Sequence, residues 1–522
     1  MNATNTKQAL SIGWASRDVS TTEPLNIPGQ FHMRISQGII DPITVTALAI
    51  DNGEDSVIFL SADIVVIRAH LLDRIRERVA ELDAGVPVMK ILMNATHTHT
   101  APTTYGERSA WRPGSDDVDG PPHEGVEIAS AAKYQDFFVN ESAEAVVEAW
   151  KKRAPGGVAY GYGFAVVAHS RREVYFDDIS KRPGMERNSR HGVHGHAMMY
   201  GSTRDPMFSH YEAGTDPFIN LLYTFDAQGR LTGAIVNVPC PAQNSEGERR
   251  LSASYWHEAR EAIRKQYGNI FILPQCAAGG DLSPRIQHYH KAEERRFALK
   301  YGDNNPKNVS EYGRRLDIGE RIAAAFTEVL EWARKDIRTA LPLQHSVETV
   351  HLSRRMISDE DVNQARAELA ELEKEPFKTD GDPIQRLDHN STLVAGRNRY
   401  RGIIARYEKQ ATEPKLPMEM HVLHLGEVAF ASNRFELYMD YMHRIQARSP
   451  FTQTFVVQLA GTPGPEGGSY LATERGVWGR GYSASIYCNV VSPQGGQDLV
   501  EATLATLNKL YEKNAEQEKN NA

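Results

Sequence analysis

The sequence reads VIFLSADIVVI at residues 57–67, AHLLDRIRERVAELDAG at residues 69–85 and VMKILMNA at residues 88–95. The first and third segments are rich in apolar and β-branched residues, which favours buried strands. The second has apolar residues at helical spacing and ends at Gly85, a typical helix stop. A strand, a helix and a second strand in this order predict an α/β fold with helices packed against a sheet.

The same alternation continues along the chain, with a helix at residues 134–153 and a hairpin turning at residues 228–229. We therefore expect the α/β class, a layered mixed sheet with flanking helices and a helical insertion. The insertion is placed at about residues 357–415, inside one large catalytic domain spanning residues 1–522. The polar tail from about residue 511 is expected to fray. A domain boundary near Asp336 is the alternative.

Composition limits the classes of function. The chain has 522 residues and a net charge of -8, so a basic surface for nucleic acid or anionic membrane is not expected. No apolar stretch is long enough to span a bilayer. No signal peptide is visible, which predicts a cytoplasmic protein and leaves a processed secreted form open. Three cysteines argue against a disulfide framework. A small-molecule substrate is the expected partner, and a homo-oligomer is compatible with the sequence.

Five segments share one layout, a β-rich run followed by polar residues at its end. In open α/β sheets ligands bind beyond the carboxyl ends of strands, so these loops are predicted to meet in one crevice. The residues concerned are His97 and His99, Cys240, Gln275, Cys276 and Asp281, Glu436, and Tyr470.

Each of these residues also has an ordinary structural interpretation. His97 and His99, two apart, put both rings on one face of an extended chain, where they can bind a metal or simply hydrogen-bond to backbone. Cys240 is either a zinc thiolate or a small buried apolar residue. Glu436 also suits a helix start, and Tyr470 also suits packing. The loop at residues 176–209 carries His191, His194 and His196, which fit either substrate contact or a solvated loop.

Several motifs together resemble the neutral/alkaline non-lysosomal ceramidase family. ATHTHTAP at residues 95–102 is similar to that family's ATHTHSGP signature, and residues 29–65 are similar to its first two strands. GGDLSP, NRFELY and SYLAT resemble its GDVSP, PGEFT and YITT segments. The resemblance runs in order from about Gly13 to about Leu507.

The resemblance implies a zinc site and a metal-activated water that cleaves an amide. By position it assigns His97, Glu436 and Tyr470 as ligands, with His99 beside them. Cys240 falls where the family has its second histidine, so a His/Cys/Glu/Tyr set is expected, with another divalent metal or no metal left open. Ala277 falls on a family serine. Because the resemblance covers the family's catalytic pattern alone, a counterpart of its C-terminal immunoglobulin-like domain is not expected in these residues.

We therefore predict a metal-dependent hydrolase, with zinc as the expected cofactor, that acts on an amide or ester of a small polar substrate rather than on ceramide. In this prediction His99, Asp63 and Asp281 are catalytic, and His97, Cys240, Glu436 and Tyr470 hold the metal. The substrate-binding residues are Arg34, Arg171, His194, His196 and Gln275. Two alternatives are glycoside cleavage by Glu436, Asp281 and Asp63 on the same scaffold, and a binding protein without catalysis.

Overall fold

The computed structural model describes residues 9–105, 121–185, 194–302 and 309–521. Its largest element is an eight-stranded mixed sheet. Its strands, in spatial order, are β14 (Phe271–Cys276), β13 (Leu231–Val238), β12 (Phe218–Asp226), β7 (Ala154–Phe164), β1 (Ser11–Asp18), β4 (Thr44–Asp51), β5 (Ser56–Ala62) and β6 (Ile91–Ala95). The pairs β5–β6 and β13–β14 are parallel, and the other pairs are antiparallel.

A second, four-stranded sheet lies against the first. It consists of β16 (Leu343–Ser353), β17 (Lys415–Leu425), β18 (Val428–Ser432) and β20 (Gln453–Val457), with β18 and β20 parallel. Apolar side chains of both sheets form one buried cluster, in which the rings of Phe59 and Phe430 lie 4.9 Å apart. Burial of this apolar surface is the main force holding the two sheets together.

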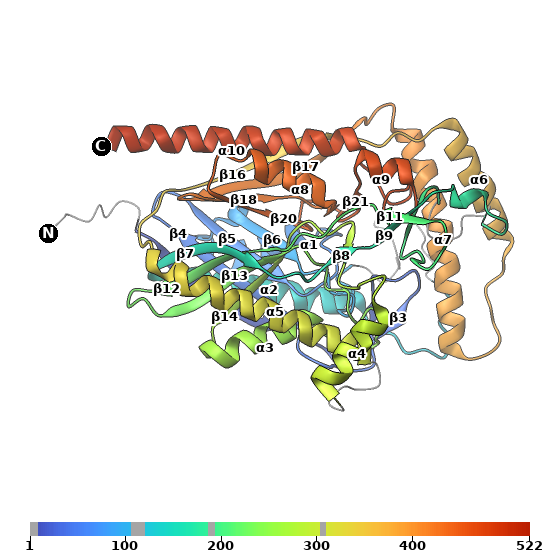
Figure 1. The fold of residues 1–522 in the computed structure, drawn as a ribbon, viewed down its shortest axis with the longest axis horizontal. Coiled ribbons are helices and arrows are strands. Elements are labelled where there is room, and N and C mark those ends of the chain that lie inside the picture. The colour runs from blue at the N-terminus through green and yellow to red at the C-terminus, as the bar shows by residue number, and fades with distance from the viewer. Residues whose placement is uncertain (1–8, 106–120, 186–193, 303–308, 522) are drawn as a thin grey trace.

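Helices cover the outer faces of both sheets (Figure 1). On the eight-stranded sheet, α2 (Ala131–Lys151) packs against β1 and β4, and α5 (Val309–Ala333) packs against β7 and β12. Behind these lie α1 (Leu71–Leu82), α3 (Tyr255–Tyr267) and α4 (His290–Tyr301). On the four-stranded sheet lie α8 (Met439–Arg448) and α10 (Pro493–Asn521). The layers are therefore helices, sheet, sheet, helices.

The eight-stranded sheet curls so that the two ends of its strand order meet. The carbonyl oxygen of Pro274 on β14 accepts hydrogen bonds from Ser61 Oγ on β5 at 2.6 Å and from Asn94 Nδ2 on β6 at 3.1 Å. The carboxyl ends of β6 and β14 consequently lie next to each other, although the strands are at opposite ends of the order.

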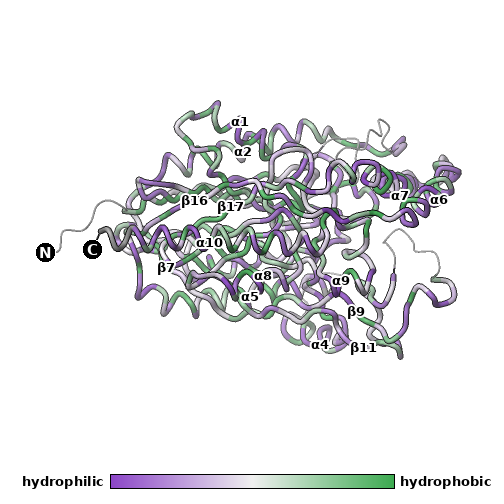
Figure 2. The backbone as a smooth tube through the Cα atoms, turned by 90° about the horizontal axis from the view of Figure 1, so that it is seen from above, coloured by the Kyte–Doolittle hydropathy of each residue, from purple (hydrophilic) through white to green (hydrophobic). Residues whose placement is uncertain are grey.

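Two helices, α6 (Asp359–Lys374) and α7 (Pro383–Lys409), lie between β16 and β17 in the chain. Both views place them together, at the end of the molecule away from both termini (Figures 1 and 2). Ser358 begins α6 with a capping box, and Pro383 is at the first position of α7, where proline is favoured. This helical pair is the one expected from the charged segment near residues 357–415.

Short elements complete the fold around the end of the sheets. They are β2 (Asn26–Ile27), β3 (Arg34–Ile35), β8 (His169–Ser170), β9 (Arg172–Tyr175), β10 (Ala197–Met199), β11 (Phe208–Tyr211), β15 (Leu282–Ser283), β19 (Glu436–Leu437), β21 (Tyr470–Leu471) and α9 (Glu474–Gly479), with 3-10 turns at Val88–Lys90, Ile179–Lys181 and Arg334–Asp336.

The expected layered α/β fold with mixed strands and flanking helices is confirmed. The expected strands and helices are present within a few residues of their predicted bounds. The last helix, α10, continues to Asn521 and so includes the tail from about residue 511. Among the described residues, none of the helices has both the length and the apolar composition needed to cross a membrane.

Candidate active site

Three parallel strand pairs deliver polar side chains to one region. His97 and His99 follow β6, Gln243 follows β13, and Glu436 follows β18. The loop after β20 leads to Tyr470, and the two-stranded parallel pair β19–β21 places Glu436 directly opposite Tyr470. The carboxylate and the phenol are therefore neighbours because of backbone pairing, as the rule for strand carboxyl ends predicts.

His97 is held in an unusual backbone conformation. Its φ is 64°, in the left-handed region that residues other than glycine rarely occupy. Its N–H donates to Ile64 O at 3.0 Å, and its Nδ1 lies 2.7 Å from Val65 O. Because a carbonyl oxygen only accepts, Nδ1 carries the proton, and Nε2 faces the site. Such strained positions concentrate at functional sites.

Nε2 of His97 faces two other polar groups. It lies 3.3 Å from Glu436 Oε2 and 3.3 Å from His99 Nε2. Glu436 Oε2 is buried and has no hydrogen-bond partner among the described residues. Two lone pairs at this distance repel each other, and a nearby positive charge relieves that repulsion. The Arg171 guanidinium supplies one such charge, and a cation bound between Nε2 and Oε2 would supply another.

Arg171 supplies a fixed charge on the other side of the carboxylate. Its Nη2 lies 3.5 Å from Glu436 Oε2, donates to the Tyr470 hydroxyl at 3.3 Å, and donates to Gly280 O at 2.9 Å. The guanidinium is 1% exposed. Arg171 is outside the described residues that line the cavity, so it holds Glu436 and Tyr470 from behind, and its predicted contact with substrate stays a prediction.

The position of His99 is fixed by a chain of hydrogen bonds. Arg171 Nη1 donates to Gln243 Oε1 at 2.9 Å, which leaves the Gln243 amide nitrogen 2.9 Å from His99 Nε2. His99 Nε2 is therefore an acceptor. Arg34 Nη2 donates to His99 O at 2.6 Å, and a Cβ on Gly29 would come within 2.7 Å of His99 Nδ1. The ring is thus positioned from both of its sides.

Burial and charge pull the pKa values of the site in different directions. Burial would raise the pKa of the Glu436 carboxyl, but His97, Arg171 and Tyr470 outweigh it and lower that pKa. Burial raises the pKa of Tyr470 well above its usual value, although Arg171 opposes this. Glu436 is therefore a carboxylate at neutral pH, beside a guanidinium whose pKa the neighbouring Tyr470, Tyr200 and Glu436 raise against burial.

Three of the four predicted metal ligands come together. His97 Nε2, Glu436 Oε2 and the Tyr470 hydroxyl are nitrogen and oxygen donors of the kind that zinc accepts, and three protein ligands with an open position are typical of catalytic zinc. His97 also donates its other ring proton to a backbone carbonyl, as metal-binding histidines do. Within the described ranges no three His, Cys, Asp or Glu side chains are grouped to hold a metal, so the set depends on tyrosine.

The structure does not bring Cys240 to this set. Its Sγ donates to Val167 O at 3.3 Å inside the hydrophobic core, and the residue is 0% exposed. Burial raises the pKa of its thiol well above the usual value, which disfavours the thiolate that zinc requires. The residue follows Pro239 and precedes Pro241 on a turn that directs the side chain inwards.

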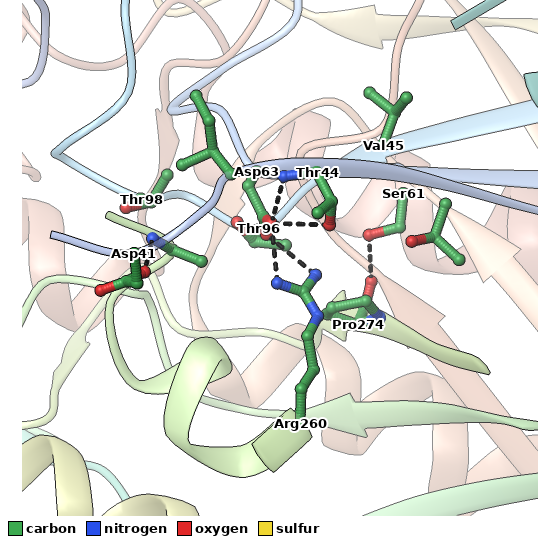
Figure 3. A network of polar contacts seen from close by, with 12 residues as sticks. Asp41, Thr44, Val45, Ser61, Asp63, Thr96, Thr98, Arg260 and Pro274 are labelled. Atoms are coloured by element: carbon green, nitrogen blue, oxygen red, sulfur yellow. Dashed lines mark hydrogen bonds and ion pairs between the residues drawn. The ribbon is translucent and has the colours of Figure 1, made fainter. Parts of the chain in front are cut away.

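Asp63 and Asp281 lie behind the site rather than in it. The Asp63 carboxylate accepts from Arg260 at 2.8 and 3.2 Å, from Thr44, and from Thr96 at 3.2 Å, as Figure 3 shows. It therefore anchors the residue before His97 and is a structural ion pair, not a catalytic acid.

Asp281 accepts from the backbone N–H of Met439 at 3.0 Å, at the start of α8. Burial raises the pKa of its carboxyl to about 7. Both catalytic predictions are thus corrected to positioning roles, since each carboxylate is engaged by the fold.

The remaining predicted substrate contacts are also placed elsewhere. Arg34 is 2% exposed and donates to carbonyl oxygens of Pro28, His99, Glu246 and Glu248. Gln275 is fully buried in β14 and accepts from Asn237. The His196 ring stacks on the Trp478 ring, with their centres 4.8 Å apart, and the backbone of His194 forms an isolated β-bridge with that of Arg480. These four are outside the described residues that line the cavity. His191 lies outside the described residues.

A cavity of about 700 Å³ opens beside His97, Glu436 and Tyr470, which together are called the active set. His97, His99, Glu436 and Tyr470 line it at one end, with Gly29, Tyr105 and Tyr482. Residues of α7 line it as well, so the inserted helix is part of the site and does not only pack on the outside. Its size suits a small-molecule ligand.

Sequence reasoning missed two residues of the site. Gln243 was within the strand-end segment that contains Cys240, three residues further on. Glu246 lies in the same loop, where its Oε2 is 3.6 Å from His99 Nδ1 and its carboxylate pairs with Arg285. The position of this loop at the end of a strand indicated a functional site, whereas Cys240 within the loop is not part of it.

Comparison with solved structures identifies the architecture. The neutral ceramidase from Pseudomonas aeruginosa superposes with a TM-score of 0.63 over 96% of this chain and 75% of its own, at 16% identity. The chain has the neutral ceramidase fold. A ceramidase complexed with C2 superposes with a TM-score of 0.62 over 97% of this chain and 76% of its own, at 14% identity. No protein-family model matches the sequence, and no curated protein matches it significantly.

Within this neutral ceramidase fold, the expected histidine, glutamate and tyrosine lie together, and the two departures noted in the sequence are both buried. Cys240 and Ala277 are 0% and 1% exposed. Ala277 N–H donates to Val238 O at 2.9 Å, as part of the packed end of β13 and β14. Neither position offers a functional group to the cavity.

Proposed function

We propose that the protein is a hydrolase that cleaves an amide or ester bond of a small polar substrate in the cavity beside His97, Glu436 and Tyr470. The observation that carries the proposal is the juxtaposition of His97 Nε2 and Glu436 Oε2 at 3.3 Å, buried and next to a fixed guanidinium. The fold, shared with two ceramidases, supports the same class of reaction.

In this proposal a divalent cation, zinc by its ligand preference, is held by His97, Glu436 and Tyr470. When bound, such a cation supplies Lewis-acid polarisation of a carbonyl and lowers the pKa of water. Cys240 contributes no ligand, because its thiol faces Val167 in the core.

The protein's own groups would position the reactants and move protons. The Arg171 guanidinium stabilises negative charge that develops on the substrate carbonyl oxygen. His99 Nε2 would take a proton from the attacking water once the Gln243 amide has released it, and would return that proton to the leaving nitrogen or oxygen. The water oxygen forms the new bond to the carbonyl carbon as the bond to the leaving group breaks.

The choice of a polar substrate over ceramide is supported by the charged side chains of the cavity lining, although apolar surface makes up more of that lining than polar surface does. Arginine, glutamate and tyrosine side chains make up much of its lining. The glycosidase alternative is disfavoured in the form proposed from the sequence, because Asp63 pairs with Arg260 and Asp281 caps α8. No opposing pair of carboxylates is formed from the described residues named for that role.

A substrate screen on purified protein tests the proposal. Small amides and esters are offered with and without added zinc, and hydrolysis is measured for wild type, His97→Ala, Glu436→Gln and the control His290→Ala, an exposed histidine at the start of α4. We expect both site variants to lose turnover by at least about a hundredfold while the control keeps it. Turnover unchanged in Glu436→Gln contradicts the proposal. Ligand binding without turnover of any substrate favours the binding-protein alternative.

A further inference from the structure

The cavity beside the active set contains many more cations than carboxylates. Among the residues that the structure describes, three glutamates line it, Glu413, Glu436 and Glu466. The cations are Arg68, Arg354, Arg355, Arg399, Arg401, Arg406, Lys409 and Arg434. The whole chain has a net charge of -8, so this concentration of positive charge runs against the overall composition.

These cations are contributed by separate parts of the fold. Arg68 follows β5, Arg354 follows β16, and Arg434 follows β18. Four others belong to α7, namely Arg399, Arg401, Arg406 and Lys409. Glu413 is 3.5 Å from Arg354, and Glu436 already belongs to the active set. Arg401 pairs with Glu373 at 3.0 Å, and Arg406 donates to the carbonyl oxygens of Ile486 and Asn489, so these two arginines of α7 are engaged by the fold.

Arg434 is a deeply buried arginine of the cavity that has a distant carboxylate as its ion-pair partner. Its side chain is 6% exposed, and its Nε has no hydrogen-bond partner among the described residues. The nearest carboxylate is Glu466, at 3.7 Å, whose own side chain is 55% exposed. At that distance the pair is not a direct hydrogen bond.

Arg68 lines the same cavity. Its Nε is likewise buried without a partner among the described residues, and its guanidinium lies 5.2 Å from the centre of the Tyr105 ring. A Cβ on Gly468 would come within 3.2 Å of Arg68 Nη2, so the glycine keeps space beside this nitrogen. Gly468 is two residues before Tyr470, and Arg434 is two before Glu436. Both arginines thus border the active set.

A buried guanidinium nitrogen without a hydrogen-bond partner is costly, and an anion bound beside it would offset that cost. The planar fork of arginine matches the oxygens of carboxylate, sulfate and phosphate groups. We propose that Arg68 and Arg434 form an anion subsite for an oxyanion group of the substrate, next to the bond that is cleaved. That the bound oxyanion belongs to a substrate rests on the proposed function, whereas the anion subsite itself does not.

Binding of small probes measures the subsite without any turnover. Benzoate, phenyl sulfate, phenyl phosphate and the neutral benzyl alcohol are titrated by calorimetry into wild type, Arg68→Gln, Arg434→Gln and the control Arg448→Gln. Arg448 lies on α8 and pairs with Glu501 at the surface, outside the cavity lining. We expect at least one anion to bind wild type at least tenfold more tightly than benzyl alcohol. Each cavity variant should weaken that binding at least tenfold, and the control should change it less than twofold.

Glu466→Gln gives a test with the opposite sign. Glu466 is exposed, so the variant should fold, and it removes the carboxylate that competes for Arg434. We expect the preferred anion to bind several-fold more tightly. The proposal is overturned by anion binding that is absent, that is equal in wild type and both arginine variants, or that weakens in Glu466→Gln.

The two proposals fail in different ways. Arginine-dependent anion binding with no hydrolysis of any substrate retains the subsite and removes the hydrolase. Hydrolysis lost in Glu436→Gln, but with the same kcat/KM in Arg434→Gln as in wild type for anionic and neutral substrates, retains the hydrolase and removes the subsite.

Discussion

At the scale of single residues, the direction of a side chain decides whether a motif has a function. Cys240 stands in a strand-end loop that reaches the site, yet its Sγ faces Val167 O at 3.3 Å in the core. We expect Cys240→Ala to bind the same amount of zinc per chain as wild type, and to keep kcat/KM within about twofold. Removing the buried sulfur should lower the free energy of unfolding by about 1 kcal/mol. Metal analysis and denaturant unfolding check both parts, and loss of zinc in this variant would restore the thiolate as a ligand.

Asp63 and Arg260 form a buried ion pair, with side chains 0% and 6% exposed. Breaking such a pair from one side leaves an unpaired charge or donor, so Asp63→Asn should lower the free energy of unfolding by about 3 kcal/mol. Arg260→Met should do likewise. The double variant should lose less than the sum of the two, because it leaves no unpaired charge. Additive losses in urea unfolding would mean that the two groups do not interact.

At the scale of elements, the turn after β14 sets the position of β19. A Cβ on Gly280 would lie 2.3 Å from Glu436 O, a backbone atom that cannot give way without moving the strand. Gly280→Ala should therefore lower kcat at least about tenfold while the protein stays folded. Gly247→Ala is the control, since a Cβ there meets no atom within 4 Å. Equal kcat in the two variants would show that the position of β19 does not limit the reaction.

The same scale shows what the sequence could predict. Strand ends that carry His97, Glu436 and Tyr470 could be located, because apolar runs and the polar residues after them are local patterns. The parallel pairing of β19 with β21, which sets Glu436 against Tyr470, could not be located, because two-residue strands have no periodicity. Arg68 and Arg434 were missed because their closeness depends on the path of a loop between distant elements.

At the scale of the whole molecule, stability should fall in acid. Hydrogen bonds from His421 and Arg76 outweigh burial and lower the pKa of Glu419 from 4.5 to about 2, and Ser353 and Lys415 similarly lower that of Asp498 from 3.8 to about 2. Folding therefore favours the ionised forms. Their stabilisation is complete above the ordinary pKa values and is lost as the pH falls towards 2.

Glu419→Gln isolates one part of this effect. We expect the free energy of unfolding of the variant to change less steeply between pH 5 and pH 2 than that of wild type, as followed by urea unfolding at each pH. Identical slopes would show that Glu419 has the same pKa in the folded and unfolded states.

The stacking of the two sheets is also a property of the whole molecule. It could not be predicted from the sequence, because the order of strands in the chain does not show which sheets are in contact.

The central claim is that side chains from separate strand ends surround one cation and form one active site. Anomalous diffraction from crystals of the wild-type protein grown with zinc tests it most directly. We predict one strong peak per chain within bonding distance of His97 Nε2, Glu436 and the Tyr470 hydroxyl, with Cys240 Sγ still turned towards Val167. A peak at other residues, or its absence in crystals of protein that hydrolyses its substrate, would contradict the account.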